Sequence, residues 1–557
     1  MDEFSVLIGG KAGFGIDKAS MVIGRLLNRL GYRIFIYRDY PSLIRGGHTF
    51  SIIRASASKR IAAHYDKVDL IIALNQETLD IHRKRLKNDC LFLFDSDQIK
   101  FDVAQSSCGL GLGIGKILKE ENAPEIMHNI CIIGAMTKAI GINFTILEDV
   151  LKKEFTKEAD LNIKVARCGF NKAKELQKVD PSKGNNLPLV SGNEAVALGL
   201  VKGGIDAYIS YPMTPSSPIL HFLAGIAEDF SLDVIHPESE IAVILMALGY
   251  AYAGKRVAVG TSGGGFCLMT EGLSLAGMAE LPIVIILGQR PGPSTGLPTY
   301  TAQTELHFAL NAGQGEFVRF LVAPGDAEEA YYWSAIAMNL SWKYQIPSII
   351  LTDKHLGENI FNFDIEQTGD IKEQNLSVWN DSPPYKRYLI TEDGISPIAF
   401  VPNKDAVIKV NSYEHDEFGI TTEEPEITKL MQDKRLHKER FLTMDLEALA
   451  TIKIYGEKNL DTALLCWGSN KGVCVEVAGK LGLRVIQPIV MNPFPVMKFR
   501  NSLGGIKRLI VVENNATGQL AKLIKNYGFI VHDTVFKYDG RPFSCDELEE
   551  RLKRILE

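Results

Sequence analysis

The sequence predicts a multidomain α/β protein, on three observations. Its 557 residues exceed what one hydrophobic core accommodates and suggest roughly three or four domains. Short apolar segments alternate with helix-forming segments in three separate stretches, which is the pattern of α/β sheets. The polar run at 179–188, with its prolines and glycine, is typical of an interdomain linker. We therefore expect α/β domains at residues 1–180, 191–356 and 446–557, a linker at 181–190 and a connecting subdomain at 357–445.

The first domain begins with a glycine-rich turn between a strand at 4–8 and an amphipathic helix at 18–30. Glycines here allow the backbone to approach a ligand or a neighbouring strand closely. The spacing departs from Gly-x-Gly-x-x-Gly, and the next strand ends in Arg38-Asp39 rather than a clear ribose-binding acid, which disfavours a dinucleotide site. Further strands are expected at 33–37, 49–54, 70–74 and 90–94, with a helix at 146–154.

A loop of the same domain combines a cation and a histidine with two glycines. It reads Pro41-Ser42-Leu43-Ile44-Arg45-Gly46-Gly47-His48. A turn with a solvated arginine accounts for this composition. A loop in which Arg45 and His48 face a site or an interface accounts for it equally well.

The second domain presents a stiff, hydroxyl-rich loop after its first strand, at 207–210. The loop reads Tyr211-Pro212-Met213-Thr214-Pro215-Ser216-Ser217-Pro218. Its prolines hold the backbone extended, so the hydroxyl groups are presented without helical hydrogen bonds. The loop also suits the start of a helix near Pro218.

Two acids, Glu238 and Glu240, precede an apolar helix. Ile241, Ile244, Leu245 and Leu248 recur at helical spacing, which predicts a core-facing segment and a carboxylate that enters a buried place. A buried carboxylate needs a partner or a raised pKa, and active sites use both. The alternative is that these acids only stabilise a helix N-terminus.

Two loops follow the next strands of this domain. A strand at 256–261 runs into Ser262-Gly263-Gly264-Gly265 and a helix, and a strand at 283–287 runs into a loop rich in glycine and proline that carries Arg290. The planar guanidinium of an arginine suits a carboxylate. A structural arginine that ties loop carbonyls together is the alternative.

The rest of the chain supplies architecture. Glu414-His415-Asp416-Glu417 lies in a charged segment that we expect to be solvated, so we do not assign a metal to it. The remaining expected elements are strands at 318–321, 348–351, 462–466, 484–488, 509–513 and 530–533, and a helix at 327–344.

These motifs together resemble one family. Glu240-Ile241-Ala242, with 247–251 and 261–265, resembles the pyrimidine-binding domain of thiamine-diphosphate enzymes, and most of all the α subunit of 2-oxoacid:ferredoxin oxidoreductases. The loops at 42–48, 211–217 and 289–299 resemble that family's γ domain and α subunit, and 493–495 with 513–520 resembles its transketolase C-terminal-like domain. The resemblance covers nearly the whole chain in the same domain order, as a γ–α fusion.

The resemblance implies roles for single residues. Glu240 would contact the aminopyrimidine of thiamine diphosphate, with Glu238 as the alternative. The other implied residues are Thr214, Ser216 and Arg290 for the 2-oxoacid, Gly263 and Gly264 for the cofactor, and Arg45 and His48 as site-facing residues of the γ domain.

Missing motifs indicate a partner. The eight cysteines include no Cys-x-x-Cys pair, so we expect no iron–sulfur cluster on this chain. No Gly-Asp-Gly with a later Asn is present to hold a metal and a diphosphate. We expect a β subunit to carry Mg²⁺ and a [4Fe-4S] cluster, to share the cofactor in an αβ heterodimer or its dimer, and to pass electrons to ferredoxin.

The implied reaction is the reversible oxidative decarboxylation of a 2-oxoacid with coenzyme A. The resemblance favours 2-oxoglutarate, with pyruvate, branched-chain 2-oxoacids or a non-catalytic scaffold as alternatives. A net charge of −6 disfavours nucleic acid as a partner. No apolar run is long enough for a membrane span, and the N-terminus lacks a signal peptide's basic start, so we expect a cytoplasmic protein.

Overall fold

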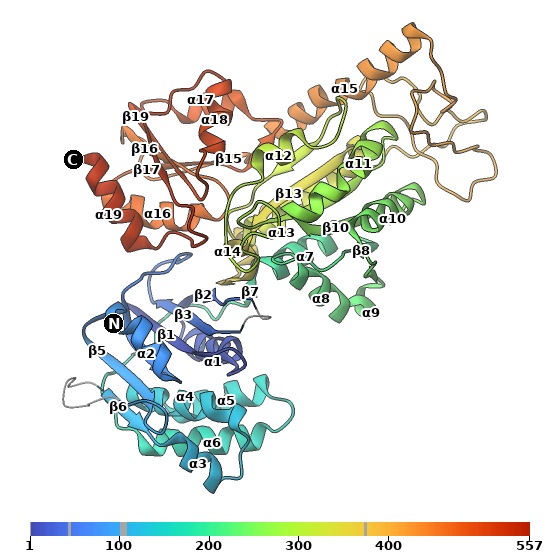
Figure 1. Cartoon of the computed structure of the whole chain (residues 1–557). Helices are drawn as coiled ribbons and strands as arrows, with labels where there is room; N and C mark the ends of the chain where they lie inside the picture. The colour runs from blue at the N-terminus through green and yellow to red at the C-terminus, as the bar shows by residue number, and fades with distance from the viewer. Residues whose placement is uncertain (1, 43–45, 101–108, 373–375) are drawn as a thin grey trace. The chain divides into compact units, whose positions relative to one another are not determined.

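The computed structural model describes residues 2–42, 46–100, 109–372 and 376–557, and it divides into two compact units (Figure 1). The first unit comprises Met1–Val190, Asn359–Asp364 and Ser544–Glu557, and the second comprises Ser191–Glu358 and Ile365–Phe543. Within the described residues, the strands form sheets of eight, seven and five strands. The predicted multidomain α/β class is confirmed, and the finer five-part division stays a prediction.

The first unit is built on a mixed sheet with the strand order β6-β5-β4-β1-β3-β2-β14-β7. At its centre, β1 (Glu3–Lys11) pairs parallel with β4 (Val68–Ala73) and antiparallel with β3 (His48–Ser56). The segment β14 (Ile360–Asn362) returns from far along the chain to pair with β2 (Arg33–Asp39). The other elements are β5 (Leu86–Asp95), β6 (Gly109–Leu112), β7 (Leu189–Ser191), α1 (Ile16–Arg29), α2 (Gln76–His82), η1 (Arg83–Arg85), α3 (Ile114–Glu120), η3 (Glu125–Met127), α4 (His128–Ala139), α5 (Phe144–Glu154), α6 (Ala159–Lys172) and α19 (Cys545–Leu556).

Helices α4 and α6, which the sequence analysis did not predict, pack through glycines. A Cβ atom at Gly134 would lie 1.9 Å from the carbonyl oxygen of Ala166, and one at Gly169 would lie 1.9 Å from that of Cys131. Only residues without a side chain allow such an approach. The backbones of the two helices therefore meet directly.

The second unit contains a seven-stranded sheet with the order β18-β12-β13-β11-β10-β8-β9 among the described residues. Its strands pair parallel, except that β18 pairs antiparallel with β12. The elements of this part are α7 (Gly192–Lys202), β8 (Ala207–Ile209), α8 (Ser217–Gly225), α9 (Ala227–Phe230), β9 (Asp233–Ile235), α10 (Glu240–Tyr252), β10 (Val257–Ser262), α11 (Gly263–Met278), β11 (Ile283–Gln289), α12 (Leu306–Asn311), β12 (Phe320–Val322), α13 (Ala327–Tyr344), β13 (Pro347–Asp353), α14 (Lys354–Glu358) and η4 (Ile365–Gln367).

The carboxyl ends of these parallel strands share one edge of the sheet. The loop with Thr214 follows β8, Glu240 follows β9, the glycines follow β10 and Arg290 follows β11. In open α/β sheets, ligands bind outside this edge. The fold thus collects at one edge the motifs that the sequence spreads over about eighty residues.

A five-stranded sheet with the order β15-β17-β16-β19-β20 completes the second unit among the described residues. Just after β17, the strand β18 leaves this region to join the seven-stranded sheet. The elements are α15 (Pro425–Glu447), β15 (Ile452–Tyr455), β16 (Thr462–Leu465), α16 (Asn470–Leu481), β17 (Arg484–Pro488), β18 (Val490–Asn492), α17 (Val496–Ser502), β19 (Arg508–Glu513), α18 (Gln519–Asn526) and β20 (Asp533–Phe536).

The connecting region is more structured than the sequence suggested. It contains the long helix α15, which begins at a proline, where the missing N–H costs no hydrogen bond. The expectation of a solvated segment around His415 was wrong, because His415 is fully buried and its ring lies 3.9 Å from that of Tyr388. The two rings pack directly, and both side chains are buried.

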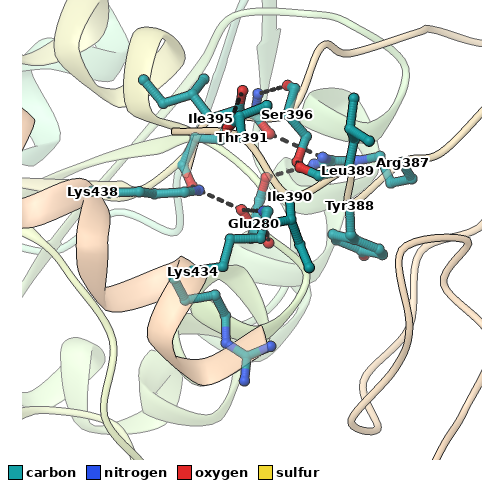
Figure 2. Close-up of polar contacts among 12 residues, drawn as sticks. Glu280, Arg387, Tyr388, Leu389, Ile390, Thr391, Ile395, Ser396, Lys434 and Lys438 are labelled. Carbon is teal, nitrogen blue, oxygen red and sulfur yellow. Dashed lines mark hydrogen bonds and ion pairs between the residues drawn. The ribbon is translucent and has the colours of Figure 1, made fainter. Parts of the chain in front are cut away.

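A buried charge cluster attaches α15 to the end of α11. Figure 2 shows Lys434 and Lys438 of α15 pointing toward Glu280, and Lys434 Nζ lies 2.7 Å from Glu280 Oε1. Arg387 donates a hydrogen bond of 2.8 Å to the carbonyl oxygen of Glu280. Burial alone would raise the pKa of Glu280, but these cations hold it well below its usual range. The carboxylate that the cations share thus stays ionised in the interior.

Candidate functional site

Glu240 is a buried acid at the first position of α10. Ser239 caps the helix, since its side chain accepts a hydrogen bond of 3.3 Å from the backbone N–H of Ala242. Glu240 is 6% exposed, whereas Glu238 is exposed. In the part of the chain that the structure describes, no group donates a hydrogen bond to the carboxylate of Glu240. Its carboxyl group is therefore available to a bound molecule.

The predicted burial of the whole apolar stripe of α10 was wrong for half of its members. Ile244 and Leu248 are buried, but Ile241 is 50% exposed and Leu245 is 48% exposed. The buried face runs instead through Glu240, Val243, Ile244, Ala247, Leu248 and Ala251. The helix is apolar on its outer face as well, a pattern typical of a face that a partner covers.

The predicted glycine motif forms the first turn of α11, and two carboxylates lie on it. A Cβ atom at Gly265 would lie 2.7 Å from Glu240 Oε1, and one at Gly263 would lie 2.7 Å from Glu305 Oε1. The first backbone N–H groups of a helix have no intrahelical partner and attract negative charge. The missing side chains thus let both acids approach the N-terminus of α11.

The middle glycine of the motif leaves an open place. The nearest atoms to a Cβ at Gly264 would be Ser294 O at 3.8 Å and Met213 Cε at 3.9 Å. Next to it, the hydroxyl of Ser262 is buried and has no hydrogen-bond partner among the described residues. An open backbone surface beside an unused buried hydroxyl is a place where a polar ligand can bind.

Thr214 and Arg290, which the sequence analysis assigned to the same ligand, lie together. Arg290 Nη1 donates a hydrogen bond of 2.9 Å to the carbonyl oxygen of Thr214. Burial lowers the pKa of Arg290. The third predicted residue, Ser216, is buried and donates its hydroxyl hydrogen to Met213 O at 2.9 Å, so it also fixes the turn.

Glu305 is a site residue that the sequence analysis missed. It is 9% exposed and lies at the end of the loop that carries Arg290, with its carboxyl group against Gly263. Burial raises its pKa to about 7, while Thr304 and Arg290 act in the opposite direction. A single acid in an irregular loop gives no periodic signal, so only its place beside Arg290 in the same loop could have suggested it.

The C-terminal part of the second unit holds the loop between Arg290 and Glu305. The side chain of Gln303 donates to Trp467 O at 2.7 Å and accepts from the backbone N–H of Asn514 at 3.0 Å. Asn515 Nδ2 donates to Gln303 O at 3.0 Å, and Gln519 Nε2 donates to Thr304 O at 2.7 Å. Gln303, Asn514 and Asn515 are buried, so their hydrogen bonds fix the loop's conformation.

In the first unit, His48 contacts a second histidine. His48 Nε2 lies 2.8 Å from His82 Nε2, and burial lowers the pKa of His82 to about 3. In this pair one neutral ring donates and the other accepts. Arg45, the other predicted residue of this loop, lies outside the described residues. The role of both residues stays a prediction.

The described residues contain no group of three or more His, Cys, Asp or Glu side chains that could hold a metal ion. Among the helices of the described ranges, none is both long and apolar enough to cross a membrane.

Comparisons with known proteins give a consistent result. Residues 198–433 match the family "Pyruvate flavodoxin/ferredoxin oxidoreductase, thiamine diP-bdg", and residues 5–172 match "Pyruvate ferredoxin/flavodoxin oxidoreductase". The 2-oxoacid:ferredoxin oxidoreductase subunit alpha of a Sulfolobus species is 31% identical, over 100% of this chain and 97% of the relative. The 2-oxoglutarate oxidoreductase subunit KorA of Mycobacterium tuberculosis is 27% identical, over 83% of this chain and 73% of the relative.

A solved structure agrees over the full length. It is the 2-oxoglutarate:ferredoxin oxidoreductase from Magnetococcus marinus with 2-oxoglutarate, coenzyme A and succinyl-CoA bound, with 27% identity, full coverage of both chains and a TM-score of 0.90. The resemblance drawn from the sequence motifs is confirmed. The chain therefore belongs to the 2-oxoacid:ferredoxin oxidoreductases, an oxidoreductase family with a thiamine-diphosphate-binding domain, and corresponds to their α subunit.

Proposed function

We propose that this chain is the α subunit of an enzyme that converts 2-oxoglutarate, coenzyme A and oxidised ferredoxin reversibly into succinyl-CoA, carbon dioxide and reduced ferredoxin. The observation that carries the proposal is the buried carboxylate of Glu240, which no described group neutralises and which lies on the glycine turn that faces the Thr214 loop. The names of the relatives that act on 2-oxoglutarate support the choice of substrate.

The residues present fit thiamine diphosphate. Gly264 offers open backbone and Ser262 an unused hydroxyl, while Glu240 can accept or hold a proton on the aminopyrimidine. When bound, this cofactor supplies the carbon nucleophile that makes decarboxylation of a 2-oxoacid possible. The task of Glu240 is to hold the pyrimidine in the protonation state that favours that nucleophile.

Arg290 and Thr214 would orient the 2-oxoacid. One N–H of the Arg290 guanidinium is used on Thr214 O, which leaves further N–H groups in the same plane for a substrate carboxylate. The Thr214 side chain is half-buried on the loop after β8 and can donate to the keto oxygen. Fixed donors of this kind lower the cost of bringing the keto carbon to the reacting position.

A β subunit is needed to complete the site. We assign to it Mg²⁺, the diphosphate half of the site and the [4Fe-4S] cluster, in an αβ heterodimer or its dimer that serves ferredoxin in the cytoplasm. Helix α10, which begins at the acid Glu240, has an exposed apolar face with Ile241 and Leu245, and Leu268 is an exposed apolar side chain of α11. This face is suited to a subunit that shares the cofactor.

Other 2-oxoacids and a non-catalytic scaffold are the competing functions. Pyruvate and branched-chain 2-oxoacids lack the distal carboxylate of 2-oxoglutarate. That carboxylate would call for a second cation, for which Arg45, His48 or a residue of the β subunit is the candidate. A scaffold has no use for a buried, unneutralised acid such as Glu240, whose burial costs free energy.

The test is viologen reduction that depends on coenzyme A, measured with a panel of 2-oxoacids on the chain co-expressed with its β subunit. We expect 2-oxoglutarate to give the highest kcat/KM. Glu240→Gln should lower activity by orders of magnitude, whereas the exposed Glu238→Gln serves as the matched control and should keep it. An assembled native complex that reduces nothing would favour the scaffold, and a loss of activity confined to Glu238→Gln would transfer the role to that acid.

A further inference from the structure

Glu305 stands at the N-cap position of α12 but does not cap that helix, since its side chain makes no capping hydrogen bond to it. Its backbone N–H donates to Gln289 Oε1 at 3.1 Å, and its carboxyl group lies instead on Gly263 at the start of α11. Thr304 Oγ1 donates to Glu305 Oε2 at 2.9 Å and lies 3.4 Å from Arg290 O. The carboxyl group is therefore directed into the site, next to the arginine.

Hydrogen bonds hold the loop on both sides of Glu305. On one side, Thr304 is held by Gln519, and on the other side the backbone N–H of His307 donates to Gln519 Oε1 at 3.1 Å. Gln303 is anchored to Trp467. These hydrogen bonds hold the chain on both sides of Glu305, so its backbone keeps its place whether the carboxyl group is charged or neutral.

The charged groups that face Glu305 come from three strand ends. Arg290 follows β11 and attracts its charge, while Asp353 at the end of β13 repels it. Glu240 follows β9 and lies on the same first turn of α11. Asp353 is itself occupied, because it accepts a hydrogen bond of 2.6 Å from Ser469 Oγ. Arg290 is thus the cation for which Glu305 and a substrate carboxylate would compete.

We propose that Glu305 is a positioning residue that controls substrate affinity through Arg290, and that the 2-oxoacid binds only when the carboxyl group of Glu305 is protonated. The inference rests on the proposed function of this site. An ionised Glu305 neutralises Arg290 and repels the anionic substrate. A protonated Glu305 leaves the charge of Arg290 to the substrate and adds an O–H donor beside it.

This coupling predicts a pH dependence of KM. Since burial raises the pKa of Glu305 to about 7, the ionised fraction grows above neutral pH, and KM at about pH 8 should be about tenfold higher than at about pH 6. In Glu305→Gln, which has the same shape and no charge, KM should stay constant over this range. The native KM at about pH 8 should then exceed that of the variant about tenfold.

The experiment uses the complete αβ complex and two readouts. The first is KM and kcat for 2-oxoglutarate against pH in the native complex, in Glu305→Gln and in Glu305→Asp, which keeps a carboxyl group and should keep a pH-dependent KM. The second needs no variant: calorimetry of 2-oxoglutarate binding to the complex without thiamine diphosphate, in buffers of different ionisation enthalpy, should count an uptake of about one proton per site at about pH 8.

Each result decides the inference. A native KM that does not change with pH, a Gln variant with the native profile, or binding without proton uptake would overturn it while the enzyme remains active. A native complex that turns over no 2-oxoacid would instead overturn the proposed function, and with it the role of Glu305.

Discussion

Replacing Glu280 by glutamine would leave Lys434 and Lys438 buried without the carboxylate that they share, and would remove the negative charge near Arg387 (Figure 2). Removing one partner of a buried ion pair costs about 3–5 kcal/mol, because the remaining charges are uncompensated. Glutamine keeps one oxygen that can accept a hydrogen bond, so we expect a value near the lower end. The loss of stability should be greatest where α15 packs against the end of α11.

Removing one lysine of the cluster should lower the free energy of unfolding less than removing Glu280 does. Burial lowers the pKa of Lys434, so Lys434 holds its proton less firmly than an exposed lysine does. In Lys434→Met, Glu280 still has Lys438 and Arg387, and we expect a destabilisation below about 2 kcal/mol. The order of the two variants therefore tests the charge balance of the cluster and not merely its burial.

The assay is hydrogen exchange of the α15 amides, which reports the free energy of local opening. A loss of about 3 kcal/mol accelerates exchange by about a hundredfold. Asp433→Asn is the matched control, because it breaks the exposed Lys429–Asp433 pair on the same helix, which should cost less than about 1 kcal/mol. Equal exchange in Glu280→Gln and Asp433→Asn would refute the reasoning, as would a larger effect of Lys434→Met than of Glu280→Gln.

Two further predictions concern the cofactor and the partner. Gly264→Ala should fold normally, since the nearest atoms outside its own helical turn, Ser294 O and Met213 Cε, would lie 3.8 and 3.9 Å from the added methyl group, yet it should weaken the binding of thiamine diphosphate in a titration of the complex. Gly265→Ala, whose methyl group would lie 2.2 Å from Thr261 Oγ1, should instead lower the thermal stability. Leu245→Glu should weaken association with the β subunit at least about tenfold in a sedimentation or pull-down titration. Met497→Glu, at an exposed apolar side chain of α17, should leave the association unchanged. Equal binding by both variants would contradict the assignment of the α10 face.

Much of the fold could be predicted because its elements carry local signals. Helix α13 has the predicted bounds, residues 327–344, and strand β17 has those predicted at 484–488. The site motifs were predictable for a related reason. The loops with Thr214, the glycines and Arg290 follow strands that were predicted, whereas Glu240 follows β9 (Asp233–Ile235), which was not.

What could not be predicted depends on contacts between distant segments. The burial of His415 results from the ring of Tyr388, and that of Glu280 from α15, more than a hundred residues further along the chain. The exposure of Ile241 and Leu245 escaped prediction for the opposite reason. A helix that is apolar all round indicates burial, and the sequence does not tell whether the chain itself or a partner provides it.

The C-terminal sheet gains a role in the chemistry from these contacts. The motif at 513–520 was expected to serve structure, yet Asn514, Asn515 and Gln519 hold Gln303 and Thr304, which lie between Arg290 and Glu305. An arginine on an irregular loop can orient a substrate only if the loop has one conformation, and the buried hydrogen bonds provide it. The sheet that is farthest from Glu240 in sequence therefore fixes the groups that would face the 2-oxoacid, and the geometry of the site depends on both parts of the second unit.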